Sequence, residues 1–167
     1  MGVFVEDLLV QKDVTMSTFT LIHVVISLIG IAAGLVAIYG FLVGKKLTAW
    51  NAVFLVMTIL TSVTGFFFPF HGIDPAILVG VISLVVLAVA VLAWTKKWAK
   101  TYIVTSLVAE FFNVLVLIVQ SFEKIAPLHA LAPKGTEPIT SVAKVVALVL
   151  FVVVGWLAVR RGRFVLG

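Results

Sequence analysis

The chain of 167 residues is 63% hydrophobic and only 11% charged, with a formal net charge of +5 and a mean hydropathy of +1.29. Since about a quarter of the residues in soluble domains are charged, this composition excludes a soluble globular protein and indicates an integral membrane protein. The absence of cysteine excludes disulfides, thiolate metal sites and cysteine nucleophiles. Basic residues beside apolar segments are explained by membrane orientation, so no nucleic-acid partner is expected.

Charge-poor stretches locate the membrane-spanning helices, because about 20 apolar residues cross a hydrocarbon core of about 30 Å. Five stretches meet this requirement, at residues 14–44, 48–70, 75–95, 101–122 and 138–159. The sequence therefore predicts an all-α fold, a polytopic bundle of five transmembrane helices.

These helices are predicted to form a single domain, residues 14–163, between a short periplasmic or interfacial segment, 1–13, and a C-terminal tail, 164–167. The first segment is acidic rather than basic, and the apolar run after it is too long for the core of a signal peptide. The first helix is therefore expected to be retained. Met16 is an alternative start of the chain.

The first predicted helix contains two pairs of glycines four residues apart, Gly30 with Gly34 and Gly40 with Gly44. Small residues at this spacing let helix backbones approach closely where no hydrophobic effect drives helices together. The helix is therefore expected to be central in the bundle or to form a contact in a homo-oligomer.

The second predicted helix runs into the stretch TGFFFPFHGIDP. Pro69 and Gly72 are expected to stop the helix as it leaves the membrane. Asp74 can cap the third helix, with Pro75 in its first turn, where a missing N–H costs nothing. The pattern predicts a tight helical hairpin and leaves His71 as the residue that the turn does not require.

The fourth predicted helix carries Ser106, Glu110, Asn113 and Gln120, followed by Lys124, at spacings of 4, 3, 7 and 4 residues. These spacings place the five side chains on one helix face. Glu110 lies near the middle of the span, where an ionised carboxylate costs at least a few kcal/mol. It is therefore expected to face the bundle interior, to be protonated or to have a partner.

Further polar groups lie in two other predicted helices. Lys144 lies about 9 Å along the fifth helix at about 1.5 Å per residue, and its side chain can reach toward Glu110 or snorkel outward. The second helix adds Thr58, Thr61, Ser62 and Thr64. Two interpretations stay open: the polar groups line a functional cavity, or they only hold the helices together.

Charge is distributed unequally between the two sides of the predicted bundle. Eight basic residues and no acid lie on one side: Lys45, Lys46, Lys96, Lys97, Lys100, Arg160, Arg161 and Arg163. The acids of the linkers and the N-terminal segment lie on the other side: Glu6, Asp7, Asp13, Asp74, Glu123 and Glu137. The positive-inside rule then predicts an N-terminus outside and a C-terminus in the cytoplasm.

All three histidines fall toward the outer side of this topology. His23 lies in the first helix, His71 at the outer end of the second, and His129 in the outer loop before the fifth. Imidazoles can ligate haem, bind copper or zinc, bond a quinone headgroup or relay protons. Their spacing matches no metal-binding motif, so packing at the interface is the competing interpretation.

No nucleophile elbow, P-loop or zinc-protease motif is present in the sequence, so a non-enzymatic protein is favoured. The segments TSVTGFFFPFHG, VLIVQSF and LHALAP resemble a set of small, uncharacterised inner-membrane proteins of bacteria. That resemblance extends through most of the chain. It implies a bacterial source and an inner-membrane location, and it implies no activity.

The leading hypothesis is a multi-pass inner-membrane protein whose polar cavity opens to the periplasm and binds a small ligand or cofactor, or an accessory subunit of a membrane complex. The cavity is predicted to be lined by Ser106, Glu110, Asn113, Gln120, Lys144 and His23, with His71 and His129 near its mouth. One alternative is a redox protein with His-ligated haem or copper, or with a quinone site. The other is a small proton- or ion-conducting protein that uses Glu110. The expected partners are the lipid bilayer and another membrane protein or a second copy of the chain.

Overall fold

The computed structural model of the chain describes residues 2–68 and 75–161. Within these ranges it contains six helices: α1 (Gly2–Val43), α2 (Thr48–Gly65), α3 (Pro75–Thr95), α4 (Ala99–Lys124), α5 (Ala126–Leu131) and α6 (Pro138–Arg161). Five of them, all except α5, are long and apolar enough to cross a membrane. The predicted all-α membrane bundle is therefore confirmed.

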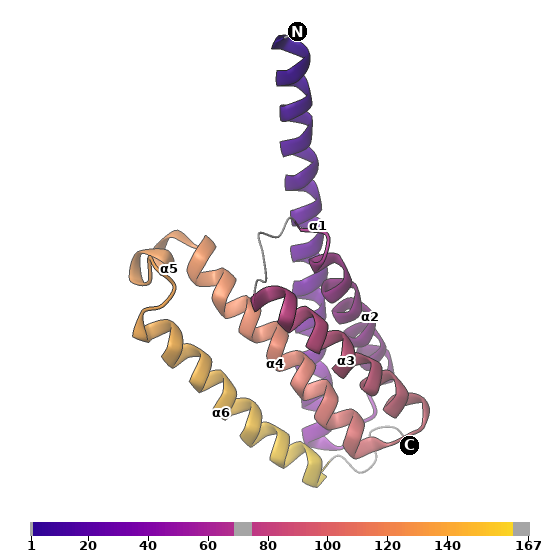
Figure 1. Ribbon diagram of the computed structural model, residues 1–167. Coiled ribbons are helices and arrows are strands. Elements are labelled where there is room, and N and C mark those ends of the chain that lie inside the picture. The colour runs from indigo at the N-terminus through magenta and orange to yellow at the C-terminus, as the bar shows by residue number, and fades with distance from the viewer. Residues whose placement is uncertain (1, 69–74, 162–167) are drawn as a thin grey trace.

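Successive long helices run in opposite directions, so the connections alternate between the two ends of the bundle (Figure 1). The α1–α2 loop, the α3–α4 loop and the last residues of α6 lie together at one end, which we call the basic end. Its described basic side chains are Lys45, Lys46, Lys96, Lys97, Lys100, Arg160 and Arg161. The opposite end carries α5 and is called the α5 end, and there α1 extends well beyond the other helices.

Helix α4 lies at the centre of the bundle, where it contacts α1, α3, α5 and α6, while α1 also contacts α2 and α6. The core between these helices combines a few large fully buried side chains with many alanines. Alanines let helix backbones approach closely, which gives van der Waals packing in a solvent that is itself apolar. The buried alanines of the core are Ala33, Ala37, Ala90, Ala93, Ala109 and Ala158.

The outward faces of the bundle are formed mainly by branched apolar side chains. On α6 this surface includes Val142, Val149 and Val152, the last of which is 62% exposed. In water such a surface would expose a large contiguous apolar patch, whereas in a bilayer it contacts hydrocarbon. A core rich in alanines and polar groups lies beneath a surface of large apolar side chains. This pattern is typical of a protein that has lipid as its solvent.

The helices differ most from the predicted spans at three places. Helix α1 begins at Gly2 rather than at residue 14, because no helix-breaking residue follows Gly2 before the apolar run. Helix α2 ends at Gly65, not at residue 70, and Phe66–Phe68 form turns whose N–H groups bond to the carbonyls of residues 63–65. Residues 126–131 form the short helix α5, whereas the sequence predicts a loop there.

The hairpin between α2 and α3 is only partly described. Helix α3 starts at Pro75, as predicted from the tolerance of the first turn for proline. The helix stop expected at Pro69 and Gly72 is wrong in position, since α2 has already ended at Gly65. The roles predicted for Asp74 and His71 lie outside the described residues.

Candidate functional site

Glu110 is enclosed in the centre of the bundle. It lies about 17 Å along α4 at about 1.5 Å per residue, near half of a hydrocarbon core of about 30 Å. Its side chain is 0% exposed. Oε2 accepts a hydrogen bond from Asn113 Nδ2 at 3.3 Å, while Oε1 is buried without a hydrogen-bond partner among the described residues.

Gly34 of α1 provides the space that the Glu110 carboxyl group occupies. A methyl group added at Gly34 would lie 2.5 Å from Cδ and 2.9 Å from Oε1 of Glu110, and it would also overlap Oε2. Carbon atoms in favourable contact are about 3.5–4.0 Å apart, so no larger side chain fits at residue 34 without movement of the carboxyl group. The glycine therefore places α1 directly against the acid of α4.

Asn113 connects this acid to α2. Its Nδ2 also donates to Thr58 Oγ1 at 3.2 Å, and a primary amide has two N–H groups, so it can serve both acceptors. Thr58 is fully buried, and the α1 backbone approaches it at Gly30, where an added methyl group would lie 3.5 Å from its Oγ1. Helices α1, α2 and α4 thus meet around one small set of polar atoms.

Polar groups continue from Glu110 toward the α5 end. Thr61 Oγ1 is buried and has no hydrogen-bond partner among the described residues. One turn further, Thr64 Oγ1 lies 2.7 Å from His23 Nδ1 and donates its own proton to the Leu60 carbonyl at 2.6 Å. With that hydroxyl proton on the Leu60 carbonyl, Thr64 Oγ1 can accept a hydrogen bond from Nδ1 of His23, and in that tautomer Nε2 is the acceptor nitrogen of the neutral ring.

Polar groups also continue toward the basic end. Ser106 Oγ, one turn from Glu110 on α4, is buried without a partner among the described residues. Tyr102, fully buried, donates its hydroxyl to Asn51 Oδ1 at 2.9 Å. Asn51 Nδ2 in turn donates to the Leu47 carbonyl at 2.9 Å, at the start of α2.

Together these side chains form a line through the interior of the bundle, which we call the polar column. Its members are His23 of α1, Asn51, Thr58, Thr61 and Thr64 of α2, and Tyr102, Ser106, Glu110 and Asn113 of α4. Between Asn51 and Thr64 the column extends about 20 Å along α2, which is about two thirds of the hydrocarbon thickness. Glu110 is its only carboxylic acid.

The polar face predicted for α4 is divided by the structure. Ser106, Glu110 and Asn113 lie in or against the core, whereas Gln120 is exposed near the α5 end. Lys144 is half-buried on α6, and within the described residues no hydrogen bond or ion pair joins it to Glu110. The partners that sequence reasoning missed are Asn51 and the hydroxyl of Tyr102, although an asparagine within an apolar span is a signal that points inward.

Of the three histidines, the structure describes His23 and His129. His23 packs its ring edge-on against Phe68, with ring centres 5.0 Å apart, and bonds to Thr64. His129 is exposed on α5, and His71 lies outside the described residues. No group of three His, Cys, Asp or Glu residues that could hold a metal occurs in the described part of the chain, and the site predicted from all three histidines stays a prediction.

The glycines of α1 make their close contacts within one chain. Gly30, Gly34 and Gly40 are buried, and the first two admit α2 and the Glu110 carboxyl group. A homo-oligomer would therefore use another surface of the bundle, and homo-oligomerisation itself stays a prediction.

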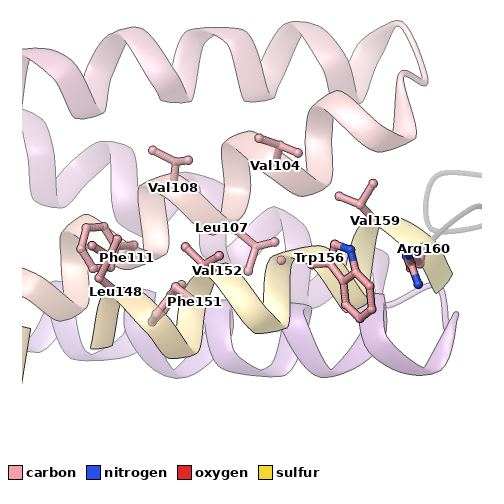
Figure 2. Close-up of a pocket in the computed structure, with 11 residues that line it drawn as sticks. Val104, Leu107, Val108, Phe111, Leu148, Phe151, Val152, Trp156, Val159 and Arg160 are labelled. Carbon is pink, nitrogen blue, oxygen red and sulfur yellow. The ribbon is translucent and has the colours of Figure 1, made fainter. Parts of the chain in front are cut away.

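Apart from the polar column, an apolar groove lies between α4 and α6 (Figure 2). No protein-family model, curated protein or solved structure matches the chain.

The groups of the polar column are a carboxylic acid, hydroxyls, amides, a phenol and an imidazole. All of these can bind or pass on a proton or a hydrogen bond, and the acid and the imidazole can change charge near neutral pH when their surroundings favour it.

Proposed function

We propose that the protein binds and transfers protons within a bacterial inner membrane, with Glu110 as the proton-binding residue. One observation carries this proposal: the Glu110 carboxyl group is fully enclosed near mid-depth, and one of its oxygens has no partner among the described residues. Intramembrane ionisable residues are costly and commonly mark proton or ion pathways.

The surroundings of Glu110 favour its neutral form. An ionised Glu110 carboxylate would accept only one hydrogen bond, from the Asn113 amide, in a medium of low dielectric constant. Burying a charge in this way costs several kcal/mol or more. A neutral acid removes that cost and places a proton on the carboxyl group. A proton is also a ligand small enough for the site, because Gly34 closes the space beside the carboxyl group.

Hydroxyl groups on both sides of Glu110 support a route for the proton. Thr61 toward the α5 end and Ser106 toward the basic end each have a buried Oγ without a partner in the described structure. A hydroxyl can accept one proton while donating another, so it can link a carboxylic acid to water that enters between the helices. His23 at the α5 end and the Tyr102–Asn51 pair at the basic end would be the two ends of this route.

The charge distribution supports an orientation for the proposed route. The basic end has seven described Lys and Arg side chains and no described acidic one, so the positive-inside rule places it in the cytoplasm. His23 and α5 then lie toward the periplasm, and the N-terminus lies outside. The resemblance of TSVTGFFFPFHG and LHALAP to bacterial inner-membrane proteins supports the same location.

A second candidate function is a ligand or cofactor site at His23, as predicted from the sequence. Its support is that the His23 ring bonds to Thr64 through Nδ1 and packs against Phe68, which in turn packs against Phe19. This aromatic setting suits a quinone headgroup or a haem better than a polar metabolite. The absorption spectrum and metal content of the purified protein test it. A Soret band, bound quinone or stoichiometric copper would favour this candidate, and their absence at full recovery of folded protein would exclude it.

Proton flux into liposomes tests the leading proposal. The full chain is reconstituted with a pH-sensitive dye inside the vesicles, and a potassium gradient with valinomycin supplies the driving force. We expect flux above that of empty vesicles for the wild type and a fall to the empty-vesicle rate for Glu110→Gln, which keeps the size of the side chain and removes the titratable group.

Glu123→Gln is the matched control, because it removes an acid from an exposed position of the same helix. Its flux should equal that of the wild type. Equal flux for Glu110→Gln and the wild type, with both proteins folded by circular dichroism and monodisperse in detergent, would refute the role of Glu110.

A further inference from the structure

The groove between α4 and α6 shares none of its lining residues with the polar column (Figure 2). Its volume is about 550 Å³. Helix α4 contributes Val104 and Phe111, and α6 contributes Leu148, Val152 and Gly155. Since Val104, Leu148 and Val152 are exposed and both helices are candidate membrane spans, the groove faces the hydrocarbon of the bilayer.

The length of the groove matches one leaflet. From Leu148 to Arg160 it follows α6 for about 18 Å at about 1.5 Å per residue. Half of a hydrocarbon core of about 30 Å is about 15 Å. The groove therefore runs from about mid-depth to the basic end, as one acyl chain of a phospholipid does.

The basic end of the groove is built from two stacked side chains. The guanidinium carbon of Arg160 lies 3.7 Å from the centre of the Trp156 ring, one helical turn earlier. Stacking holds the guanidinium plane against the indole and leaves its N–H edge able to donate to an anion, preferably in a bidentate manner to phosphate. Tryptophan itself is favoured at the level of lipid headgroups.

Within residues 2–68 and 75–161, the charged groups around Arg160 are all positive. Arg161 follows it directly, and the end of α1 packs here, since a methyl group added at Gly44 would lie 3.8 Å from the Arg161 carbonyl oxygen. This contact brings the loop with Lys45 and Lys46 to the end of α6. The acids whose side chains are described are Glu110, inside the core, and Glu123 and Glu137, at the α5 end. The mouth of the groove is therefore complementary to an anion.

We propose that the α4–α6 groove binds an anionic phospholipid, with one acyl chain along Val104, Val152 and Gly155 and the phosphate on Arg160. Hydrocarbon alone does not distinguish this groove from the rest of the bilayer, because lipid chains are as apolar as the residues that line it. The selectivity comes from the basic mouth, and basic pockets between transmembrane helices recognise anionic headgroups in this way. The occupant is a lipid rather than a soluble ligand, because the groove is open along its length to the membrane.

Native mass spectrometry of the full chain with added phosphatidylglycerol or phosphatidylcholine tests this proposal. We expect one retained phosphatidylglycerol per chain, with clearly weaker retention of phosphatidylcholine. Arg160→Gln should weaken phosphatidylglycerol binding by about tenfold, the loss expected for one charge-assisted contact. Gly155→Leu should weaken it by filling the groove, and Gly155→Ala should not, since its methyl group would meet Leu107 Cδ1 at an ordinary 3.5 Å.

Lys124→Gln is the matched control, because it removes one positive charge from the exposed α5 end. It should leave phosphatidylglycerol binding unchanged, and a loss equal to that of Arg160→Gln would overturn the proposal by showing diffuse attraction only. Equal retention of both lipids, displacement of phosphatidylglycerol by inorganic phosphate, or a dimer that excludes lipid would also overturn it. Arg160 is exposed, so Arg160→Gln should leave the core intact. A loss of lipid binding by this variant then reports on the groove and not on unfolding.

Discussion

Replacing Gly34 by alanine tests the contact between α1 and the Glu110 carboxyl group. The added methyl group would lie 2.5 Å from Cδ of Glu110, about 1 Å inside a normal carbon contact. Either the carboxyl group leaves its place against Asn113 or α1 and α4 separate. Inserting a methyl group into a packed core costs about 1–3 kcal/mol, whereas alanine gains about 1 kcal/mol over glycine in helix propensity.

A double-mutant cycle separates these two effects. In the wild type, Gly34→Ala should lower the free energy of unfolding by about 0–2 kcal/mol, the overlap cost less the propensity gain. In a Glu110→Ala background the overlapping atoms are gone, so the same substitution should be neutral or stabilising. The expected coupling energy is about 1–3 kcal/mol, the size found for residues in direct contact.

Reversible unfolding in mixed micelles with rising SDS, followed by circular dichroism, measures the four free energies. Gly155→Ala is the control, because its methyl group would meet Leu107 at 3.5 Å and should show only the propensity gain. If Gly34→Ala costs the same with and without the Glu110 side chain, the two residues do not contact and the arrangement of α1 against α4 is wrong.

Two further predictions concern the ends of the bundle. Tyr102→Phe leaves Asn51 Oδ1 without its donor and should cost about 0.6–1.7 kcal/mol, the range for interhelical hydrogen bonds in membranes. Tyr39→Phe, at an exposed position, should cost nothing in the same unfolding assay, and equal losses would argue against the bond. The Lys134 backbone N–H, which donates to Glu137 Oε1 at 2.9 Å, lowers the pKa of Glu137 below its ordinary value of 4.5. A carboxylate with a lowered pKa stabilises its loop above pH 4.5 and loses that effect as pH falls through the folded-state pKa. Glu137→Gln should therefore remove a pH dependence of thermal stability below about pH 4.5, and an unchanged acid profile would contradict the contact.

The sequence determined the membrane class and the number of spans, because each apolar run is long enough to cross a bilayer and each linker is polar. It also predicted that Glu110 faces the interior, is protonated or has a partner, since a carboxylic acid at mid-span is costly in lipid, and the structure encloses its side chain. Helix ends were less well predicted. Gly65 ends α2 before Pro69, and the short α5 forms in a stretch that has no long periodic pattern.

The tertiary structure alone decided which groups meet. Asn51 and Tyr102 are 51 residues apart in the chain, and Gly34 and Glu110 lie on different helices, so no local spacing relates them. Helical periodicity shows which residues share a face, whereas the rotation of each helix against its neighbours decides what that face touches. In lipid that rotation is set by close packing of small residues and by pairing of buried polar groups, not by a water-driven apolar stripe. For this reason Ser106, Glu110 and Asn113 entered the core while Gln120, on the same predicted face, remained outside.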